Sequence, residues 1–159
     1  MKFAIVSDTH DNTANFNKAI NFLNKEKIEI MLHCGDISNQ ETMNEAVQNF
    51  NGNISFVRGN ADYNLHDVPD SLSLDIGDKK VAFIHYPDLA KKLAENGNYD
   101  LVFYGHTHKP WEEKVPARPG GGICRLVNPG ELAGQRFKPT FAIYDTETDK
   151  LELKILEKL

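Results

Sequence analysis

Five short apolar runs in this 159-residue chain each lead directly into residues that can bind a metal ion. Continuous apolar runs of this length are typical of strands buried on both faces, as in parallel sheets. The runs and the residues that follow them are KFAIVS before Asp8 and His10, IMLHC before Asp36, ISFV before Asn60, VAFI before His85, and LVFY before His106 and His108. Because the ends of adjacent strands converge in space, we expect these seven side chains to meet at one sheet edge.

The segments between the first runs carry apolar residues at helical spacing, which predicts helices over residues 12–27 and 40–50. Asp11, Asn12 or Thr13 can cap the first helix. The inward-facing residues are predicted to be Ala14, Ala19, Ile20 and Leu23 in the first helix and Met43, Ala46, Val47 and Phe50 in the second. Strands alternating with helices predict parallel pairing in a layered α/β fold.

The second half of the chain is richer in strand patterns. Gly77-Asp78 between SLSLDI and KVAFIH is a good two-residue hairpin turn. A short helix is predicted over 88–96, and the further strands are predicted in DLVFYG, CRLVN, TFAIYDT and KLELKILE. We therefore expect a second sheet packed on the first. With no internal repeat or linker, residues 1–159 are expected to form a single domain.

Composition excludes several classes of protein. A content of 40% hydrophobic residues supports a sizeable core, yet no run reaches the ~18 apolar residues of a membrane span. The chain starts at once with a strand, so we expect no signal peptide and a cytoplasmic location. The net charge of −5 makes a long nucleic acid an unfavourable partner. Two bound divalent cations would still attract a small anionic phosphate locally.

Carboxylate, imidazole and amide groups together suit divalent cations. Asp8 and His10 stand at alternate positions, so in an extended segment both side chains can reach one ion, and His106 and His108 repeat this spacing. Asp36 follows a glycine and offers two carboxylate oxygens, which makes it the natural bridge between two ions. Such a site holds its ions ~3.5–4 Å apart and activates a bridging water for hydrolysis.

Each of these patterns also has a plain structural interpretation. Gly-Asp and Gly-Asn are common turns, an Asp-x-His is often a helix cap beside a surface histidine, and a single His85 can be a satisfied core residue. Their joint occurrence after five strand-like runs favours the metal site. Cys34 and Cys124 are too few for a disulfide framework, and Cys34 is expected to be a buried thiol.

The order of the motifs is specific: Asp-x-His, Gly-Asp, Gly-Asn, a lone His and Gly-His-x-His. In that order they resemble the calcineurin-like metallophosphoesterase superfamily, and more narrowly its small archaeal and bacterial phosphodiesterases, whose relatives include the retromer scaffold subunit Vps29. The resemblance extends from SDTHDN to the NPGE segment at residues 128–131. It implies a four-layer α/β/β/α sandwich with mixed sheets and with metals at the strand ends.

The resemblance also implies a ligand assignment. It gives one metal Asp8, His10, Asp36 and His108, and the other metal Asp36, Asn60, His85 and His106. The catalytic residues among these are expected to be Asp36, Asn60 and His106. The cofactors are expected to be two divalent ions per chain, Mn²⁺ or Ni²⁺ first, with Zn²⁺ or Fe as alternatives, since nitrogen and oxygen donors suit all of them.

Two positions depart from the superfamily pattern. Many members have a histidine after Gly-Asn that protonates the leaving alcohol, whereas this chain has Ala61. General acid catalysis is typically worth ~10²–10⁴-fold, so its loss should matter most for poor leaving groups. Tyr86 follows His85 where relatives often have His-Gly, and it can either line the pocket or simply pack, while Pro87 fixes the following turn.

The first functional hypothesis is a binuclear phosphodiesterase in which a metal-bound hydroxide attacks a small phosphodiester in line. The alternative is a Vps29-like binding scaffold with little or no catalysis, which Ala61 permits but the complete set of four ligand histidines disfavours. A phosphomonoesterase or protein phosphatase is disfavoured by the absent acid and the small size.

Several residues near the motifs keep two interpretations. Asp62 can orient a ligand or cap a loop, Asn128 can lie near the pocket or only form a turn, and Arg58 can bind substrate phosphate or, more simply, pair with a surface acid. His33 and His66 are expected to be structural. Trp111 lies in a polar segment and can be half-buried, close over substrate or anchor a homo-oligomer such as a dimer.

Overall fold

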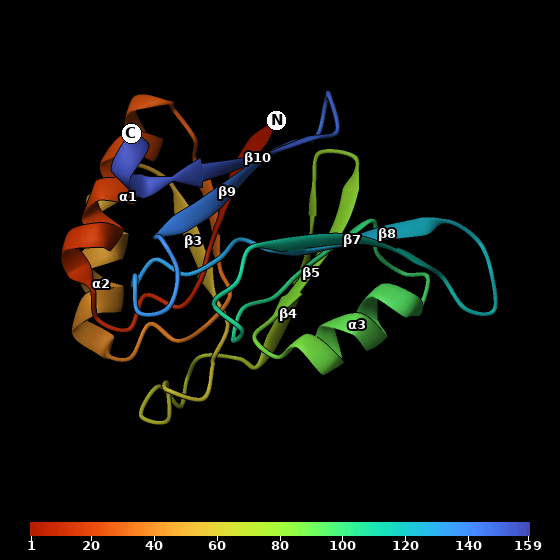
Figure 1. Ribbon diagram of the computed structural model, residues 1–159, viewed down its shortest axis with the longest axis horizontal. Coiled ribbons are helices and arrows are strands. Elements are labelled where there is room, and N and C mark those ends of the chain that lie inside the picture. Colours follow the sequence, from red (N-terminus) through yellow and green to blue (C-terminus); the bar gives the residue numbers. More distant parts are fainter.

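The computed structural model describes residues 1–159 and contains two five-stranded mixed sheets (Figure 1). The first sheet has the strand order β10-β9-β1-β2-β3, and the second has the order β4-β5-β6-β8-β7. The strands are β1 (Lys2–Val6), β2 (Ile30–His33), β3 (Asn53–Phe56), β4 (Ser71–Ile76), β5 (Lys79–Ile84), β6 (Leu101–Phe103), β7 (Trp111–Pro116), β8 (Ile123–Asn128), β9 (Thr140–Asp145) and β10 (Lys150–Ile155). The helices are α1 (Thr13–Lys25), α2 (Gln40–Asn49), α3 (Pro87–Glu95) and a final 3₁₀ turn, η1 (Leu156–Lys158).

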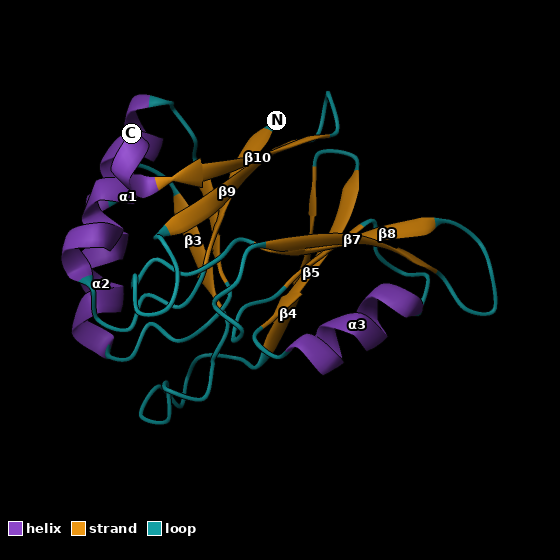
Figure 2. Cartoon of the chain, in the orientation of Figure 1, coloured by secondary structure: helices purple, strands orange, loops and turns teal.

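Helices cover the outer faces of the two sheets, so the fold has four layers (Figure 2). The helices α1 and α2 pack on the first sheet through a cluster that includes Phe16, Leu23 and Phe141. The short helix α3 packs on the second sheet through Ala90 and Ala94. The expected α/β/β/α sandwich with mixed sheets is therefore confirmed.

The five apolar runs identified in the sequence are strands in the parallel parts of the two sheets. The strand β1 pairs in parallel with β2, and β2 with β3, while β5 pairs in parallel with β6, and β6 with β8. Their carboxyl ends therefore point the same way within each sheet. The strands β9, β10, β4 and β7 are antiparallel to their neighbours, and β4 and β5 form the predicted hairpin around Gly77-Asp78.

The helix predictions hold except at two positions. Asn12 caps α1 by accepting a hydrogen bond from the Asn15 amide at 3.1 Å. Ala14 is exposed rather than inward-facing, because the buried stripe starts at Phe16 and a residue two positions away lies on the opposite face. In α2 the prediction for Val47 is wrong, since Thr42 and Ala46 face the core and Val47 is 55% exposed.

The strand β7 was not anticipated by the sequence pattern. Most of its residues are exposed and half of them are charged, because β7 is the edge strand of the second sheet and has a neighbour on only one side. Pairing with β8 holds it, with Trp111 opposite Asn128. The Trp111 side chain is 52% exposed, as the half-buried interpretation requires. Its contact with a second copy of the chain stays a prediction.

Two further expectations concern cysteines and membranes. Cys34 and Cys124 are both free and buried. No helix is both long enough and apolar enough to cross a bilayer.

The contact between the two sheets should dominate stability. Phe103 is fully buried there and meets Phe3 edge to face, with 5.8 Å between ring centroids. We expect Phe103→Ala to lower the free energy of unfolding by about 3–5 kcal/mol, since it removes a large buried side chain. The matched control Val47→Ala, on the exposed face of α2, should change it by less than about 0.5 kcal/mol. Urea denaturation measures both, and equal effects would contradict this view of the core.

Candidate metal centre

Backbone hydrogen bonds tie together the neighbouring loops at the strand ends of each sheet. The amide of Asp8 donates to the carbonyl of Gly35 at 2.9 Å, and the amide of His10 donates to the carbonyl of Asp36 at 2.9 Å. In the second sheet the amide of Gly105 donates to the carbonyl of His85 at 3.0 Å. These bonds fix where the side chains of the sequence-predicted site can point.

Five of the seven predicted ligand residues have a left-handed backbone, with φ of 52° at Asp8, 44° at His10, 59° at Asp36, 71° at His106 and 65° at His108. Such residues cost about 1–3 kcal/mol each and gather at functional sites. The expectation of extended segments with alternate side chains is therefore wrong. Asp8 and His10 do meet, but through a turn, while His106 and His108 point into two different clusters.

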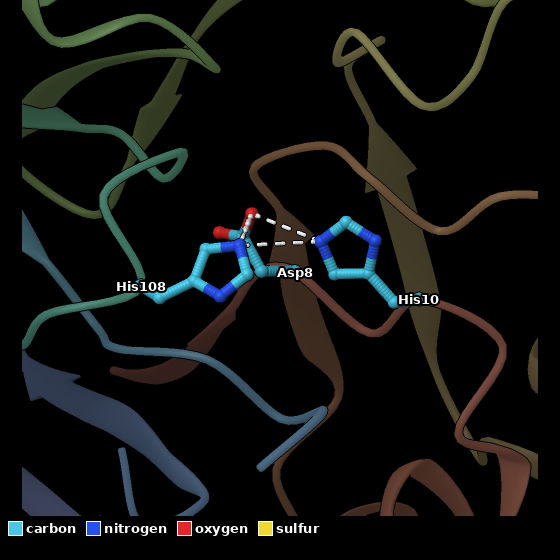
Figure 3. A group of neighbouring side chains, drawn as sticks. All are labelled: Asp8, His10 and His108. Carbon is cyan, nitrogen blue, oxygen red and sulfur yellow. Dashed lines mark hydrogen bonds and ion pairs between the residues drawn. The ribbon is translucent and has the colours of Figure 1, made fainter. Parts of the chain in front are cut away.

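The first cluster consists of Asp8, His10 and His108, whose ligand atoms face one another (Figure 3). The Nε2 atoms of His10 and His108 are 3.3 Å apart, and they lie 3.6 Å and 3.3 Å from Oδ1 of Asp8. Asp8 is fully buried. One carboxylate oxygen and two imidazole nitrogens are thus turned toward a common point.

The two oxygens of Asp8 have different surroundings. Oδ2 accepts hydrogen bonds from the Ser7 hydroxyl at 2.6 Å and from the His106 amide at 3.1 Å. Oδ1 is buried and has no hydrogen-bond donor. Burial opposes ionisation of Asp8, but its contacts with His10 and His108 hold its pKa well below the usual range. A buried carboxylate oxygen without a donor, facing two imidazoles, fits a bound cation.

The second cluster consists of Asp36, His85 and His106, and Asn60 completes it. Nε2 of His85 lies 3.2 Å from Oδ2 of Asp36 and 3.1 Å from Oδ1 of Asn60. Nδ1 of His106 lies 3.0 Å from the same Asn60 oxygen and 3.3 Å from Nε2 of His85. All four sequence-predicted residues of this set are therefore brought together.

The orientation of His85 suits a ligand. Its Nδ1 lies 2.8 Å from the carbonyl oxygen of Cys34, to which it can only donate, so in the neutral ring Nε2 carries the lone pair. Burial lowers the pKa of His85, but the neighbouring Asp36 carboxylate outweighs this and raises it. Tyr86 packs against the rings of His85 and His106, with centroid distances of 5.1 Å and 5.5 Å.

Asp36 lies between the two clusters. Its Oδ2 is 3.5 Å from Nε2 of His10 in the first cluster and 3.2 Å from Nε2 of His85 in the second. Its Oδ1 accepts a hydrogen bond from the Ala61 amide at 2.8 Å. Burial raises the pKa of Asp36, yet the contact with His85 brings it below its ordinary value, so the group is a carboxylate.

Two glycines let the loops approach the carboxylates this closely. A Cβ on Gly59 would lie 2.2 Å from Oδ1 of Asp36, and a Cβ on Gly105 would lie 2.0 Å from the Ser7 hydroxyl and 2.6 Å from Oδ2 of Asp8. All three contacts are far too short for any side chain. The glycines before Asn60 and His106 are therefore packing requirements of the site.

Asp62 fastens the loops that carry Asp36 and Asn60. It is fully buried, and its Oδ2 accepts from the amides of Asp36 at 2.7 Å and Gly59 at 2.8 Å, while Oδ1 accepts from the amide of Ser38 at 2.7 Å. It orients the backbone rather than a ligand side chain.

The other residues with two interpretations fall outside the ligand sets. Arg58 pairs with the surface residue Asp70, with Nε at 3.1 Å from its Oδ1, as the simpler interpretation holds. Asn128 stabilises its own turn, because its Oδ1 accepts a hydrogen bond from the Gly130 amide. It also supports the loop that carries His106, because its Nδ2 donates to the Gly105 carbonyl. His66 is exposed.

His33 is fully buried next to the site without entering it. Its Nδ1 accepts from the Gly35 amide at 3.2 Å, and its Nε2 lies 2.8 Å from the Thr9 hydroxyl. Burial lowers its pKa to about 4, so the ring is neutral. It is structural, as expected, and links the loops after β1 and β2.

Sequence reasoning missed Ser7 and Glu131. Ser7 donates to Asp8, and the buried Glu131 contacts Nδ1 of His108. Glu131 could have been suspected from the NPGE segment, where a charged residue follows a turn at the end of an apolar strand. Nothing in the pattern marks Ser7, since it ends a strand like any small residue.

The fold and the two clusters define a class of protein that the comparisons also identify. The calcineurin-like phosphoesterase superfamily domain matches residues 1–149, and the chain belongs to this superfamily. The resemblance inferred from the motifs is thus confirmed. This fold implies divalent metal ions, and the two side-chain clusters provide candidate ligands for them.

Individual relatives show which members of the superfamily this chain is similar to. A phosphodiesterase from Methanocaldococcus jannaschii is 34% identical, over 99% of this chain and 100% of that protein. The solved structure of a novel archaeal phosphodiesterase is 32% identical, with a TM-score of 0.84, over 98% of this chain and 99% of that one. Vps29 from Entamoeba histolytica, solved with Zn²⁺, has a TM-score of 0.74 over 96% of this chain and 90% of that one. Its identity is 18%, so it shares the fold alone.

The role of Asp62 can be tested without any metal. In Asp62→Asn one carboxylate oxygen becomes an amide donor, which must face at least one of the three backbone amides. We expect unfolding free energy to fall by about 1–3 kcal/mol in chelator-treated protein. Asp70→Asn, on the exposed ion pair, is the matched control and should stay within about 0.5 kcal/mol. If the two variants unfold alike, Asp62 does not fasten these loops.

Proposed function

We propose that this protein is a metal-dependent phosphodiesterase that hydrolyses small phosphodiesters. The observation that carries the proposal is the position of Asp36, whose Oδ2 lies within 3.5 Å of an imidazole nitrogen of each cluster. A carboxylate in that position can bridge two cations. The phosphodiesterase named among the relatives, alike over its full length, supports the choice of a diester substrate.

The proposed centre holds two divalent cations. One would be bound by Asp8, His10, Asp36 and His108, and the other by Asp36, Asn60, His85 and His106. Their mixed oxygen and nitrogen donors favour Mn²⁺ or Ni²⁺, with Zn²⁺ or Fe as alternatives. Both sheets contribute to each set, so we propose that residues 1–159 act as one domain.

The charge of the centre suits an anionic substrate. Among the ligand side chains only Asp8 and Asp36 are carboxylates, and the histidines and Asn60 bind in their neutral forms. Bound divalent cations would polarise the phosphate and lower the pKa of a bound water, which supplies the nucleophile. Because two carboxylates would not neutralise two such ions, the centre would stay positive and would attract phosphate although the protein is acidic.

Asn60 and His106 are the most exposed of the ligand residues, while His10 is only partly exposed, so substrate would enter on the side of Asn60 and His106. The Oδ1 of Asn60 faces His85 and His106, which leaves its Nδ2 group to donate a hydrogen bond to a phosphate oxygen. In this proposal Asp36 and His106 would bind the metal ions at which the reaction takes place, and Asn60 would bind a metal ion and also contact the substrate.

Ala61 limits the substrates. Its side chain offers no proton, and its amide is already bonded to Oδ1 of Asp36. A leaving alcohol must therefore depart without a proton from this position. Esters with stable leaving groups should react best.

Metal dependence is the direct test. Chelator-treated protein should be inactive on bis(4-nitrophenyl) phosphate and regain activity with Mn²⁺ or Ni²⁺. Asp36→Asn and His106→Ala should lose at least ~10²-fold, the scale of a removed catalytic contribution. The exposed His66→Ala is the control and should match the wild type.

The possible outcomes of this assay distinguish a phosphodiesterase from a binding scaffold and from a phosphomonoesterase. No turnover with any cation would overturn the enzyme and favour a scaffold. Faster turnover of 4-nitrophenyl phosphate than of the diester would overturn the substrate class.

Leaving-group dependence tests the role of Ala61. Across a series of aryl diesters, the rate should fall steeply as the pKa of the leaving phenol rises, because no side chain at this position protonates it. The slope of log kcat/KM against that pKa is the measurement. A flat slope in a range where chemistry limits the rate would show that another residue donates the proton.

A further inference from the structure

We propose that Glu131 is a positioning residue that fixes the His108 ring in the tautomer able to bind a cation through Nε2. The inference rests on the proposed metal centre, because it concerns the first cluster, Asp8, His10 and His108. It adds a residue outside the ligand sets, on the turn that follows β8.

Glu131 and His108 face each other in a buried place. Glu131 is fully buried and His108 is 6% exposed. Oε2 of Glu131 contacts Nδ1 of His108, and neither atom has another partner. A buried carboxylate is costly unless it is compensated, and this imidazole is the group that compensates Oε2.

The other carboxylate oxygen of Glu131 is anchored by the backbone. Oε1 accepts from the amides of Arg136 at 2.6 Å and Phe137 at 2.8 Å. The main chain of the turn is tied to the end of β1 by bonds from the amide of Leu132 to the carbonyl of Ser7 and from the amide of Ala133 to that of Asp8, both at 3.0 Å. The carboxylate therefore cannot turn away from His108 without breaking these bonds.

This arrangement sets the tautomer. An ionised carboxylate only accepts, and Oε2 of Glu131 lies closer to Nδ1 than Oδ1 of Asp8 lies to Nε2, so in a neutral ring the proton of His108 resides on Nδ1. Its Nε2 then carries the lone pair, 3.3 Å from Oδ1 of Asp8 and 3.3 Å from Nε2 of His10. His85 is oriented in the same way by the Cys34 carbonyl, a neutral acceptor. In each cluster, one histidine therefore has its tautomer set by an acceptor at Nδ1. In the first cluster this acceptor is the charged Glu131 carboxylate, and in the second it is the neutral Cys34 carbonyl.

The decisive variant is Glu131→Gln. Glutamine can keep Oε1 as the acceptor for Arg136 and Phe137, but it presents an amide donor to Nδ1 of His108. The ring then gains more with its proton on Nε2, where it blocks coordination. Thr140→Val is the control: it removes the bond from Thr140 to the Pro129 carbonyl in the same turn and does not touch His108.

The first measurement needs no metal. Long-range ¹H–¹⁵N spectra of chelator-treated protein, recorded at alkaline pH so that the His108 ring is neutral, report which ring nitrogen carries the proton, and the His108 signals are assigned by their loss in His108→Ala. We expect the Nδ1–H form in the wild type and in Thr140→Val, and the Nε2–H form in Glu131→Gln. The same tautomer in all three proteins would overturn the proposal.

The second measurement is Mn²⁺ titration by calorimetry. We expect Glu131→Gln to weaken one of the two sites about 10–100-fold, as removal of a partner behind a ligand histidine does. The other site, and both sites in Thr140→Val, should change by less than about twofold. Equal loss at both sites, in both variants, would mean a merely structural role. If the wild type binds no cation, the proposed function fails, while the tautomer measurement still tests Glu131.

Discussion

The buried Asp36 carboxylate is the interaction on which the candidate site depends. It faces histidines of both clusters, and its main chain is held by Asp62 on one side and by His10 on the other. Keeping this carboxylate charged where the two sheets meet requires hydrogen-bond donors and left-handed turns, which an apolar protein core would otherwise avoid. The strain of the ligand loops is thus the local cost of bringing carboxylates and imidazoles within a few ångströms.

Buried neighbours support four of the seven predicted ligand residues. Ser7, Cys34, Asp62 and Glu131 each fix one ligand residue or its backbone, and all of them are fully buried. A site held this way requires little rearrangement when a cation binds, which favours tight and selective binding. The same rigidity explains why glycine precedes Asn60 and His106, since no other residue leaves room for the carboxylates.

Much of the architecture could be predicted from the sequence, because buried parallel strands have a strong apolar signal and the ligand motifs follow them. It was harder to predict which residues face the core and which strands lie at the edge of a sheet. Val47 matches the helical period but faces solvent, and half of the residues in the edge strand β7 are charged, so the strand has no apolar signal. The left-handed turns at His106 and His108, and the contact of Glu131 with His108, depend on packing between segments far apart in sequence. No local pattern contains that information.

Each cluster draws on both sheets: Asp8 and His10 follow a strand of the first sheet, and their partner His108 follows a strand of the second. Neither half of the sandwich supplies all the candidate ligands of a cluster. Cation binding and the docking of the two sheets are therefore thermodynamically linked. At a free concentration 100 times its dissociation constant, one bound cation would stabilise the folded chain by about 2.7 kcal/mol. The metal centre would then act as a clamp between the sheets, and the supply of metal ions would help to set how long the protein stays folded.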